Sequence, residues 1–399
     1  MSLGAKVSSV KEQAQRVLEI AKVGGHVLEE RIGKSVPTSL AEVPSSVQRL
    51  STEWLSAALC ADAPGARVIS FELGDHSHGS TTRDRIRIRY NEPGRAAGLP
   101  GYLFVKSSPG FTSRLVNGLS GALESEAGFY RELRPKVDMN SPGSYHISLD
   151  TKSFRSVYLL EDVAESKGAE FGNPVTMYVD RPMAESMVRN LAAYHGRFWQ
   201  DEILSTAPWL QSSLQFQERV NDAIDFEKRT LVGVERGAGI VPREFLERRG
   251  EIWPSLMHSL RVNVSGPHTL LHSDMHIGNW YRDRDGGMGL YDWQCMSHGG
   301  WALDVVYALT SALRTEDRRA WEKDLLRLYL RELAAHGGQP PEFERAWDEY
   351  RLQIFHALVF WLYTIGSGRF QPKMQKDDVT AENVRRMAQA TIDFGSFDL

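Results

Sequence analysis

Five short segments rich in β-branched and aromatic residues restrict this chain to a small set of folds. All of them lie before residue 163, and each is bounded by Gly, Pro, Asn or Asp, as strands usually are. We therefore expect one antiparallel sheet of five strands. The segments are 66–73, 81–90, 102–107, 144–150 and 155–162.

A helical pattern interrupts this series of strands. Residues 120–135 carry apolar side chains at helical spacing and end at Pro135, which cannot continue a helix. Beyond Asp162, long amphipathic segments such as 182–200 and 321–336 predominate. The expected fold class is α+β, with one helix inserted in an N-terminal five-stranded antiparallel sheet and a mainly helical C-terminal lobe.

The length of 399 residues allows two lobes, each with its own hydrophobic core. The pattern of residues 5–31 predicts a helix, and Ser51 is a typical residue to cap the start of another. We expect an N-terminal accessory helix and loop over 1–44, a first lobe over 45–162 and a helical lobe over 163–399.

Composition excludes several classes of function. The 47 basic and 51 acidic residues give a net charge of -4, which provides no field to hold nucleic acid or an anionic membrane. Cys60 and Cys295 are too few for a disulfide framework or a cysteine zinc site. Residues 356–366 are too short to cross a bilayer, and the N-terminus has no apolar signal core. We expect a soluble, cytoplasmic protein, and nothing implies an obligate protein partner.

Residues 270–294 contain the pattern that carries chemistry. Asp274 and Asn279 have four residues between them, and Asp292 follows in DWQ. This is the spacing of phosphoryl-transfer loops, in which the first carboxylate aligns an acceptor hydroxyl. Carboxylate and amide oxygens are the ligands that Mg²⁺ prefers, so Asn279 and Asp292 are the candidate metal ligands. Asp274 and Asn279 are the candidate catalytic residues.

Two other interpretations of this stretch remain. A polar turn would use Asp and Asn to cap backbone groups. A zinc hydrolase would use His272, Asp274 and His276, but it explains neither Asn279 nor Asp292. For His272 we favour a buried imidazole that holds the loop, whereas His276 is either filler or a substrate contact.

Asp304, in ALDVVYAL, is expected to cap a helix and to brace the preceding loop rather than to touch a substrate.

Lys106 ends the apolar run YLFVK, which would place its ammonium group where nucleotide phosphates bind. Most lysines at strand ends are simply solvated. The helical pattern that follows favours the functional interpretation, because Glu126 is placed to pair with Lys106. Glu124 is a less favoured partner from the same helix.

Two further segments are candidates for nucleotide binding. Gly74, Gly79 and Ser80 belong to a polar hairpin whose backbone N–H groups a phosphate can approach, although an ordinary β-turn uses the same residues. In VYLLEDV, the carbonyl of Glu161 and the N–H of Val163 are candidates to bind an adenine edge.

Taken together, these motifs resemble the aminoglycoside phosphotransferase and choline kinase-like family, including its ecdysteroid kinase-like branch, over residues 45–395. The resemblance implies a two-lobe protein-kinase-like fold, ATP or GTP with Mg²⁺, and phosphorylation of a small-molecule hydroxyl. Asp274, Asn279 and Asp292 occupy the matching positions. The motifs, in order, are STEWLSAAL, LFVK, ESEAGFYREL, SPGSYHISLD, VYLLEDV, LAAYHGRFW, LLHSDMHIGNW, LYDWQ and ALDVVYAL.

The chain also departs from protein kinases. Its third motif is DWQ, Ser273 stands in place of an arginine, and 11 residues separate Asp292 from Asp304. This spacing leaves no room for an activation loop, which favours a small-molecule acceptor. The DWQ motif and SPGSYHISLD favour the ecdysteroid kinase-like branch. The sequence does not identify the acceptor, which is aminoglycoside-, choline- or ecdysteroid-like. The competing class is a non-catalytic nucleotide-binding sensor on the same fold.

Overall fold

A computed structural model describes residues 20–30, 32–33, 35–78, 81–368 and 374–399. Within these residues the chain forms two units. The first unit contains the described residues up to Glu132 together with Gly143–Asp162. The second contains Leu133–Pro142 and the described residues from Val163 onward.

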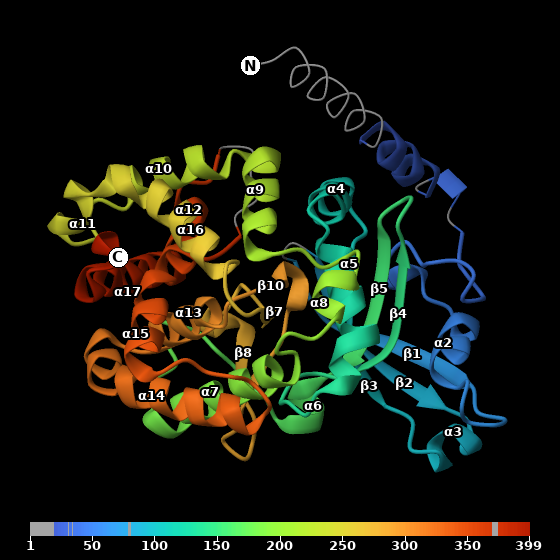
Figure 1. The fold of residues 1–399 in the computed structure, drawn as a ribbon. Helices are drawn as coiled ribbons and strands as arrows, with labels where there is room; N and C mark the ends of the chain where they lie inside the picture. The colour runs from blue at the N-terminus through green and yellow to red at the C-terminus, as the bar shows by residue number, and fades with distance from the viewer. Residues whose placement is uncertain (1–19, 31, 34, 79–80, 369–373) are drawn as a thin grey trace. The chain divides into compact units, whose positions relative to one another are not determined.

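The first unit is built on a five-stranded sheet with the order β1-β2-β3-β5-β4, in which all neighbouring strands are antiparallel (Figure 1). Each strand overlaps one of the five predicted segments, so that prediction is confirmed. The strands are β1 (Val68–His78), β2 (Thr82–Tyr90), β3 (Tyr102–Ser107), β4 (Ser144–Asp150) and β5 (Arg155–Glu161).

Helices precede and interrupt this sheet. The described part of the predicted N-terminal helix, residues 20–30, is helical, and Ser51 caps the next helix by accepting from the Trp54 N–H at 3.0 Å. The predicted inserted helix is present as α5, and a second helix, α4, precedes it. Gly121, with a φ of 77°, separates the two, because a left-handed residue ends one helix before the next begins. The helices are α2 (Thr52–Leu59), α3 (Glu92–Ala96), α4 (Phe111–Leu119) and α5 (Ala122–Gly128).

The core of the first unit lies between α2 and the sheet. Trp54 and Leu55 are fully buried there against apolar side chains of β2, β3 and β5. Leu103 and Val105 of β3 belong to this core, and Lys106 follows directly. Apolar burial of this kind is the main stabilising force of a sheet that packs on one side. It therefore holds the strand that carries Lys106.

The second unit is mainly helical, as predicted, and contains two small sheets, β10-β7 and β6-β8-β9. The observed class is thus the expected α+β. The helices are α6 (Val163–Lys167), α7 (Arg181–Arg197), α8 (Ile203–Thr206), α9 (Ser213–Ile224), α10 (Phe226–Arg236), α11 (Arg243–Glu247), α12 (Ile252–Asn263), α13 (Ala302–Ala312), α14 (Thr315–Ala335), α15 (Phe343–Leu352), α16 (Ile354–Ile365) and α17 (Asp377–Phe394). The strands are β6 (Glu170–Phe171), β7 (Thr269–Leu271), β8 (Trp280–Arg282), β9 (Met288–Leu290) and β10 (Ser297–Gly299).

Helix α13 occupies the interior of the second unit. All of its residues are buried, and it packs against α7, α15, α16 and α17. A helix that is apolar on most sides requires such an environment. In the described part of the chain, no helix has both the length and the apolar character that a membrane crossing demands.

Candidate active site

Asp274 and Asn279 lie together in the second unit, on the loop between β7 and β8. The Asn279 amide Nδ2 donates to the Asp274 backbone carbonyl at 2.8 Å and to its carboxylate Oδ2 at 3.2 Å. This arrangement turns the nitrogen of the amide toward Asp274 and leaves Oδ1 as the acceptor end of the side chain. The spacing that suggested a joint role for these two residues does bring them together.

His272 holds this loop from inside. Its ring is fully buried, Nδ1 accepts from the Asp274 N–H at 3.2 Å, and Nε2 lies 3.0 Å from the Tyr291 carbonyl. Because Nδ1 is an acceptor, the proton sits on Nε2, which donates to Tyr291. The predicted structural role of His272 is confirmed. Both nitrogens are engaged, so His272 has none to offer to zinc, and the zinc hydrolase loses a ligand.

Asp304 braces the same loop from the first turn of α13. Its buried carboxylate accepts from the N–H groups of His272 at 2.7 Å and Ser273 at 2.9 Å, and from the Tyr194 hydroxyl at 2.6 Å. Burial raises the pKa of Asp304, but its contacts with His195, His272 and Tyr194 lower it, and the net pKa lies below its ordinary value. The predicted bracing by Asp304 is confirmed. The predicted capping by Asp304 is wrong, because Asp304 lies within the first turn of α13 and the N-cap position belongs to Trp301.

Ser273 has a left-handed backbone with a φ of 65°, which costs a non-glycine residue about 1 kcal/mol or more. The buried His356 of α16 stabilises it by donating from Nε2 to the Ser273 carbonyl at 2.7 Å. Burial lowers the pKa of His356, which keeps its ring neutral. The peptide that leads into Asp274 is therefore held from both sides. Nothing in the sequence pattern indicated His356.

Asp292 follows β9 and is connected to the same loop through its neighbour, Tyr291. The Tyr291 N–H donates to the Asn279 carbonyl at 3.0 Å, while the Tyr291 carbonyl accepts from His272. Asp292 has a φ of 68°, in a region that Asp tolerates better than most residues.

The donor chemistry of Asn279 and Asp292 fits a hard cation. One amide oxygen and one carboxylate are the usual protein contribution to a Mg²⁺ that also binds phosphate oxygens and water. Within the described residues no group of three His, Cys, Asp or Glu side chains is placed to hold a metal.

Lys106 and Glu126 form a buried ion pair in the first unit. Lys106 Nζ lies 2.6 Å from Glu126 Oε1, and the two side chains are 4% and 0% exposed. This confirms the predicted pairing and the preference for Glu126 over Glu124. The hydroxyl of Tyr158, which lies opposite Lys106 in the sheet, donates to the Leu123 carbonyl of α5 at 2.6 Å. Tyr158 thus ties α5 to the strand next to Lys106, a contact that the sequence did not indicate.

Gly74 lies within β1 rather than at the tip of the hairpin. A side chain at this position would come within 3.4 Å of the Arg85 carbonyl on β2, and the register of the two strands shifts between Leu73 and His76. Gly79 and Ser80 lie outside the described residues. The role of this hairpin in nucleotide binding stays a prediction.

Glu161 belongs to the first unit and Val163 to the second. Glu161 ends β5, where its N–H donates to the Gly143 carbonyl at 2.9 Å and its Oε2 accepts from the Gly143 N–H at 3.0 Å. Val163 begins α6, and the N–H groups of a first helical turn have no partner within their own helix. Their part in binding an adenine also stays a prediction.

Comparisons with known proteins place these observations in a family. The sequence matches the phosphotransferase enzyme family over residues 111–350, more than half of the chain. No curated protein matches it.

Several solved structures are similar at low identity. A microcompartment-associated aminopropanol kinase is 13% identical, with 81% of this chain and 90% of that chain covered and a TM-score of 0.49. The GDP complex of aminoglycoside 2'-phosphotransferase-IIIa is 11% identical, with 85% and 98% covered and a TM-score of 0.49. The macrolide 2'-phosphotransferase MphH from Brachybacterium faecium is 16% identical, with 78% and 94% covered and a TM-score of 0.44. Because these identities and TM-scores are low, the assignment of the chain to a family rests on the family match and not on the individual structures.

Proposed function

Because this chain belongs to the phosphotransferase enzyme family, we propose that it is a small-molecule kinase that transfers the terminal phosphoryl group of ATP or GTP to a hydroxyl. The observation that carries this proposal is the loop of the second unit. There Asp274 and Asn279 are hydrogen bonded to each other, and Asp292 is connected to them through Tyr291.

Asp274 is the residue proposed to act on the acceptor. Its carboxylate aligns the hydroxyl and takes its proton as the new O–P bond forms and the bond from the terminal phosphorus to the bridging oxygen breaks. The side chain is 25% exposed, so a ligand has access to it. Phosphoryl transfer depends on alignment more than on covalent chemistry, and a carboxylate held by fixed neighbours suits that task.

The remaining candidates are proposed to bind the nucleotide. Asn279 and Asp292 hold Mg²⁺, which neutralises charge on the phosphates when bound. Lys106, oriented by Glu126, binds phosphate oxygens. The hairpin residues Gly74, Gly79 and Ser80 cover the phosphates, and the backbone of Glu161 and Val163 binds the base.

The short connection between Asp292 and Asp304 supports a small-molecule acceptor. Its residues form a 3₁₀ turn (Trp293–Cys295), strand β10 and the start of α13. No part of this connection is a long loop on which a peptide substrate would lie. We propose the same range of acceptors as the sequence suggested, namely aminoglycoside-, choline- or ecdysteroid-like alcohols.

The decisive variant is Asp274→Asn, which keeps the shape of the side chain but removes its basicity. We expect the rate of phosphoryl transfer to fall at least about a hundredfold, while Mg-ATP still binds with nearly native affinity. The measurement is ATP consumption in a screen of amino sugars, macrolides, sterols and amino alcohols, together with calorimetry of Mg-ATP binding. Asp285→Asn, on the exposed turn between β8 and β9, is the matched control.

Full turnover by Asp274→Asn on an identified acceptor would refute the mechanism. Tight Mg-ATP binding by the native protein without transfer to any acceptor or to water would instead favour the nucleotide sensor.

A further inference from the structure

Helix α13 contacts the loop of Asp274 at three successive points. Asp304, Tyr307 and Ser311 are spaced at i, i+3 and i+7, which places their side chains on one face of a helix. Asp304 accepts from the N–H groups of residues 272 and 273, and Ser311 Oγ accepts from the Ile277 N–H at 3.0 Å. Tyr307 lies between these two contacts.

Tyr307 contacts the Asp274 side chain itself. Its hydroxyl donates to Asp274 Oδ1 at 3.0 Å, on the oxygen that Asn279 does not use. Burial, followed by the charge of Asp274, raises the pKa of Tyr307 well above its ordinary value, so the hydroxyl keeps its proton and acts as the donor. The two carboxylate oxygens of Asp274 are thus each held by a different neighbour.

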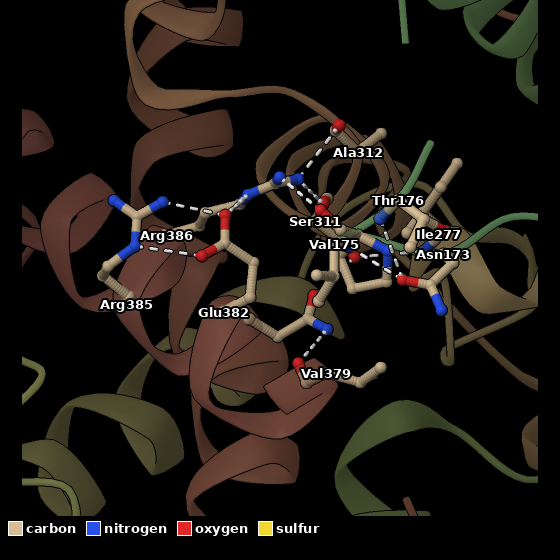
Figure 2. A network of polar contacts seen from close by, with 12 residues as sticks. Asn173, Val175, Thr176, Ile277, Ser311, Ala312, Val379, Glu382, Arg385 and Arg386 are labelled. Atoms are coloured by element: carbon tan, nitrogen blue, oxygen red, sulfur yellow. Dashed lines mark hydrogen bonds and ion pairs between the residues drawn. The ribbon is translucent and has the colours of Figure 1, made fainter. Parts of the chain in front are cut away.

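The C-terminal end of α13 is anchored by α17, as Figure 2 shows. Arg386 is 4% exposed, and its Nη1 donates to the carbonyls of Ser311 at 2.6 Å and Ala312 at 3.1 Å. A cation at the last carbonyls of a helix satisfies groups that have no partner within the helix. Ser311 Oγ also donates to the Asn383 side chain at 2.7 Å. These contacts fix the C-terminal end of α13 against α17.

We propose that Tyr307 is a positioning residue, which fixes the orientation of the Asp274 carboxylate while α13 sets the register of the loop. The proposal rests on the proposed function, in which Asp274 acts on the acceptor. A hydroxyl that donates to a carboxylate restrains its rotation and stabilises its negative charge. Tyr307 acts only through Asp274.

The test is Tyr307→Phe in the full chain, with Mg-ATP hydrolysis, in which water replaces the acceptor, as the probe reaction. We expect the turnover rate to fall about tenfold or more, the range for losing one hydrogen bond to a charged group, with Mg-ATP affinity unchanged. The loss should appear in kcat while the KM for Mg-ATP stays native, because Tyr307 acts through the carboxylate that aligns the attacking water. A residue that served packing alone would leave kcat at the native value.

A second readout does not depend on turnover. Hydrogen exchange of the backbone amides of residues 273–279 should become faster in Tyr307→Phe, because the loop has lost a restraint. The matched control is Tyr350→Phe, since Tyr350 is also fully buried and its hydroxyl has no hydrogen-bond partner among the described residues. This control should match the native protein in both rate and amide exchange.

Two results separate failure of this inference from failure of the proposed function. If Asp274→Asn is inactive while Tyr307→Phe keeps the native rate or native amide exchange, only the inference is overturned. If Asp274→Asn keeps the native rate, the proposed function fails. Should the native protein hydrolyse no ATP, the exchange measurement alone decides the role of Tyr307.

Discussion

A pair of imidazoles near the loop of Asp274 illustrates how single residues couple this protein to pH. His268 Nδ1 and His298 Nδ1 lie 2.8 Å apart, and His268 Nε2 donates to the Val264 carbonyl. Neutral His268 therefore accepts at Nδ1, and His298 donates. Burial, followed by repulsion from the His268 ring when that ring is protonated, lowers the pKa of His298 to about 4.

This shift predicts the direction of a pH effect on stability. Above pH 6.5, which is the pKa of the histidine in the unfolded state, His298 is neutral in both the folded and the unfolded protein. Its contribution to the free energy of unfolding is then fully present. Between 6.5 and about 4 the unfolded state binds more protons, so the free energy of unfolding falls as the pH falls through this window. The free energy of unfolding can be measured by urea unfolding at several pH values. Its slope against pH should be smaller in His298→Gln than in the native protein. Identical slopes would contradict the assignment.

At the scale of elements, the N-terminal helix is joined to the nucleotide-binding candidates through one buried arginine. Arg114 of α4 is fully buried and donates to Glu30 through Nη1 at 2.8 Å and Nη2 at 2.6 Å. Its Nε donates to the carbonyl of Ser108, two residues after Lys106, at 2.8 Å. A bidentate pair of this kind is both strong and directional.

We expect Glu30→Gln to lower the free energy of unfolding by about 2 kcal/mol, because a buried guanidinium loses its counter-charge but keeps one acceptor. Equilibrium urea unfolding measures this change. Glu29→Gln is the control in the same helix, since the Glu29 side chain is 79% exposed. Its effect should stay within about 0.5 kcal/mol. Equal effects of the two variants would mean that the Arg114 pair does not hold the helix.

Element prediction succeeded where the pattern was local. The alternation of Ile86 and Ile88 with charged residues identified β2, and Ser51 ahead of a short apolar run identified α2. Helix α4 was missed because FTSRLVNGL contains Gly, Asn and Thr, which are weak helix formers. There, tertiary contacts such as the buried Arg114 outweigh intrinsic propensity.

At the scale of the whole molecule, nucleotide binding should increase the thermal stability of the protein. A ligand that binds only the folded protein, at a concentration a hundredfold above its Kd, raises the free energy of unfolding by about 2.7 kcal/mol. We expect Mg-ATP to raise the Tm of the native protein, and Asp292→Asn to lose most of the increase that depends on Mg²⁺. Thermal unfolding with ATP, in the presence of either Mg²⁺ or EDTA, measures this difference.

Asp285→Asn should keep the full increase, because this residue lies on an exposed turn away from the proposed ligands. A native Mg²⁺-dependent increase in Asp292→Asn would show that Asp292 does not hold the cation.

The five strands of the first unit, several of the helices, and the neighbourhood of Asp274 and Asn279 were determined by the sequence alone. Those features arise within short stretches of chain, where side-chain periodicity and a five-residue separation suffice. Only the tertiary structure decided what surrounds the loop. His356 and Arg386 come from helices far along the chain, and their contacts depend on packing that no local pattern encodes. Tyr307 and Ser311 combine the two kinds of information. Their spacing from Asp304 can be read from the sequence, whereas only the tertiary structure shows which loop they contact.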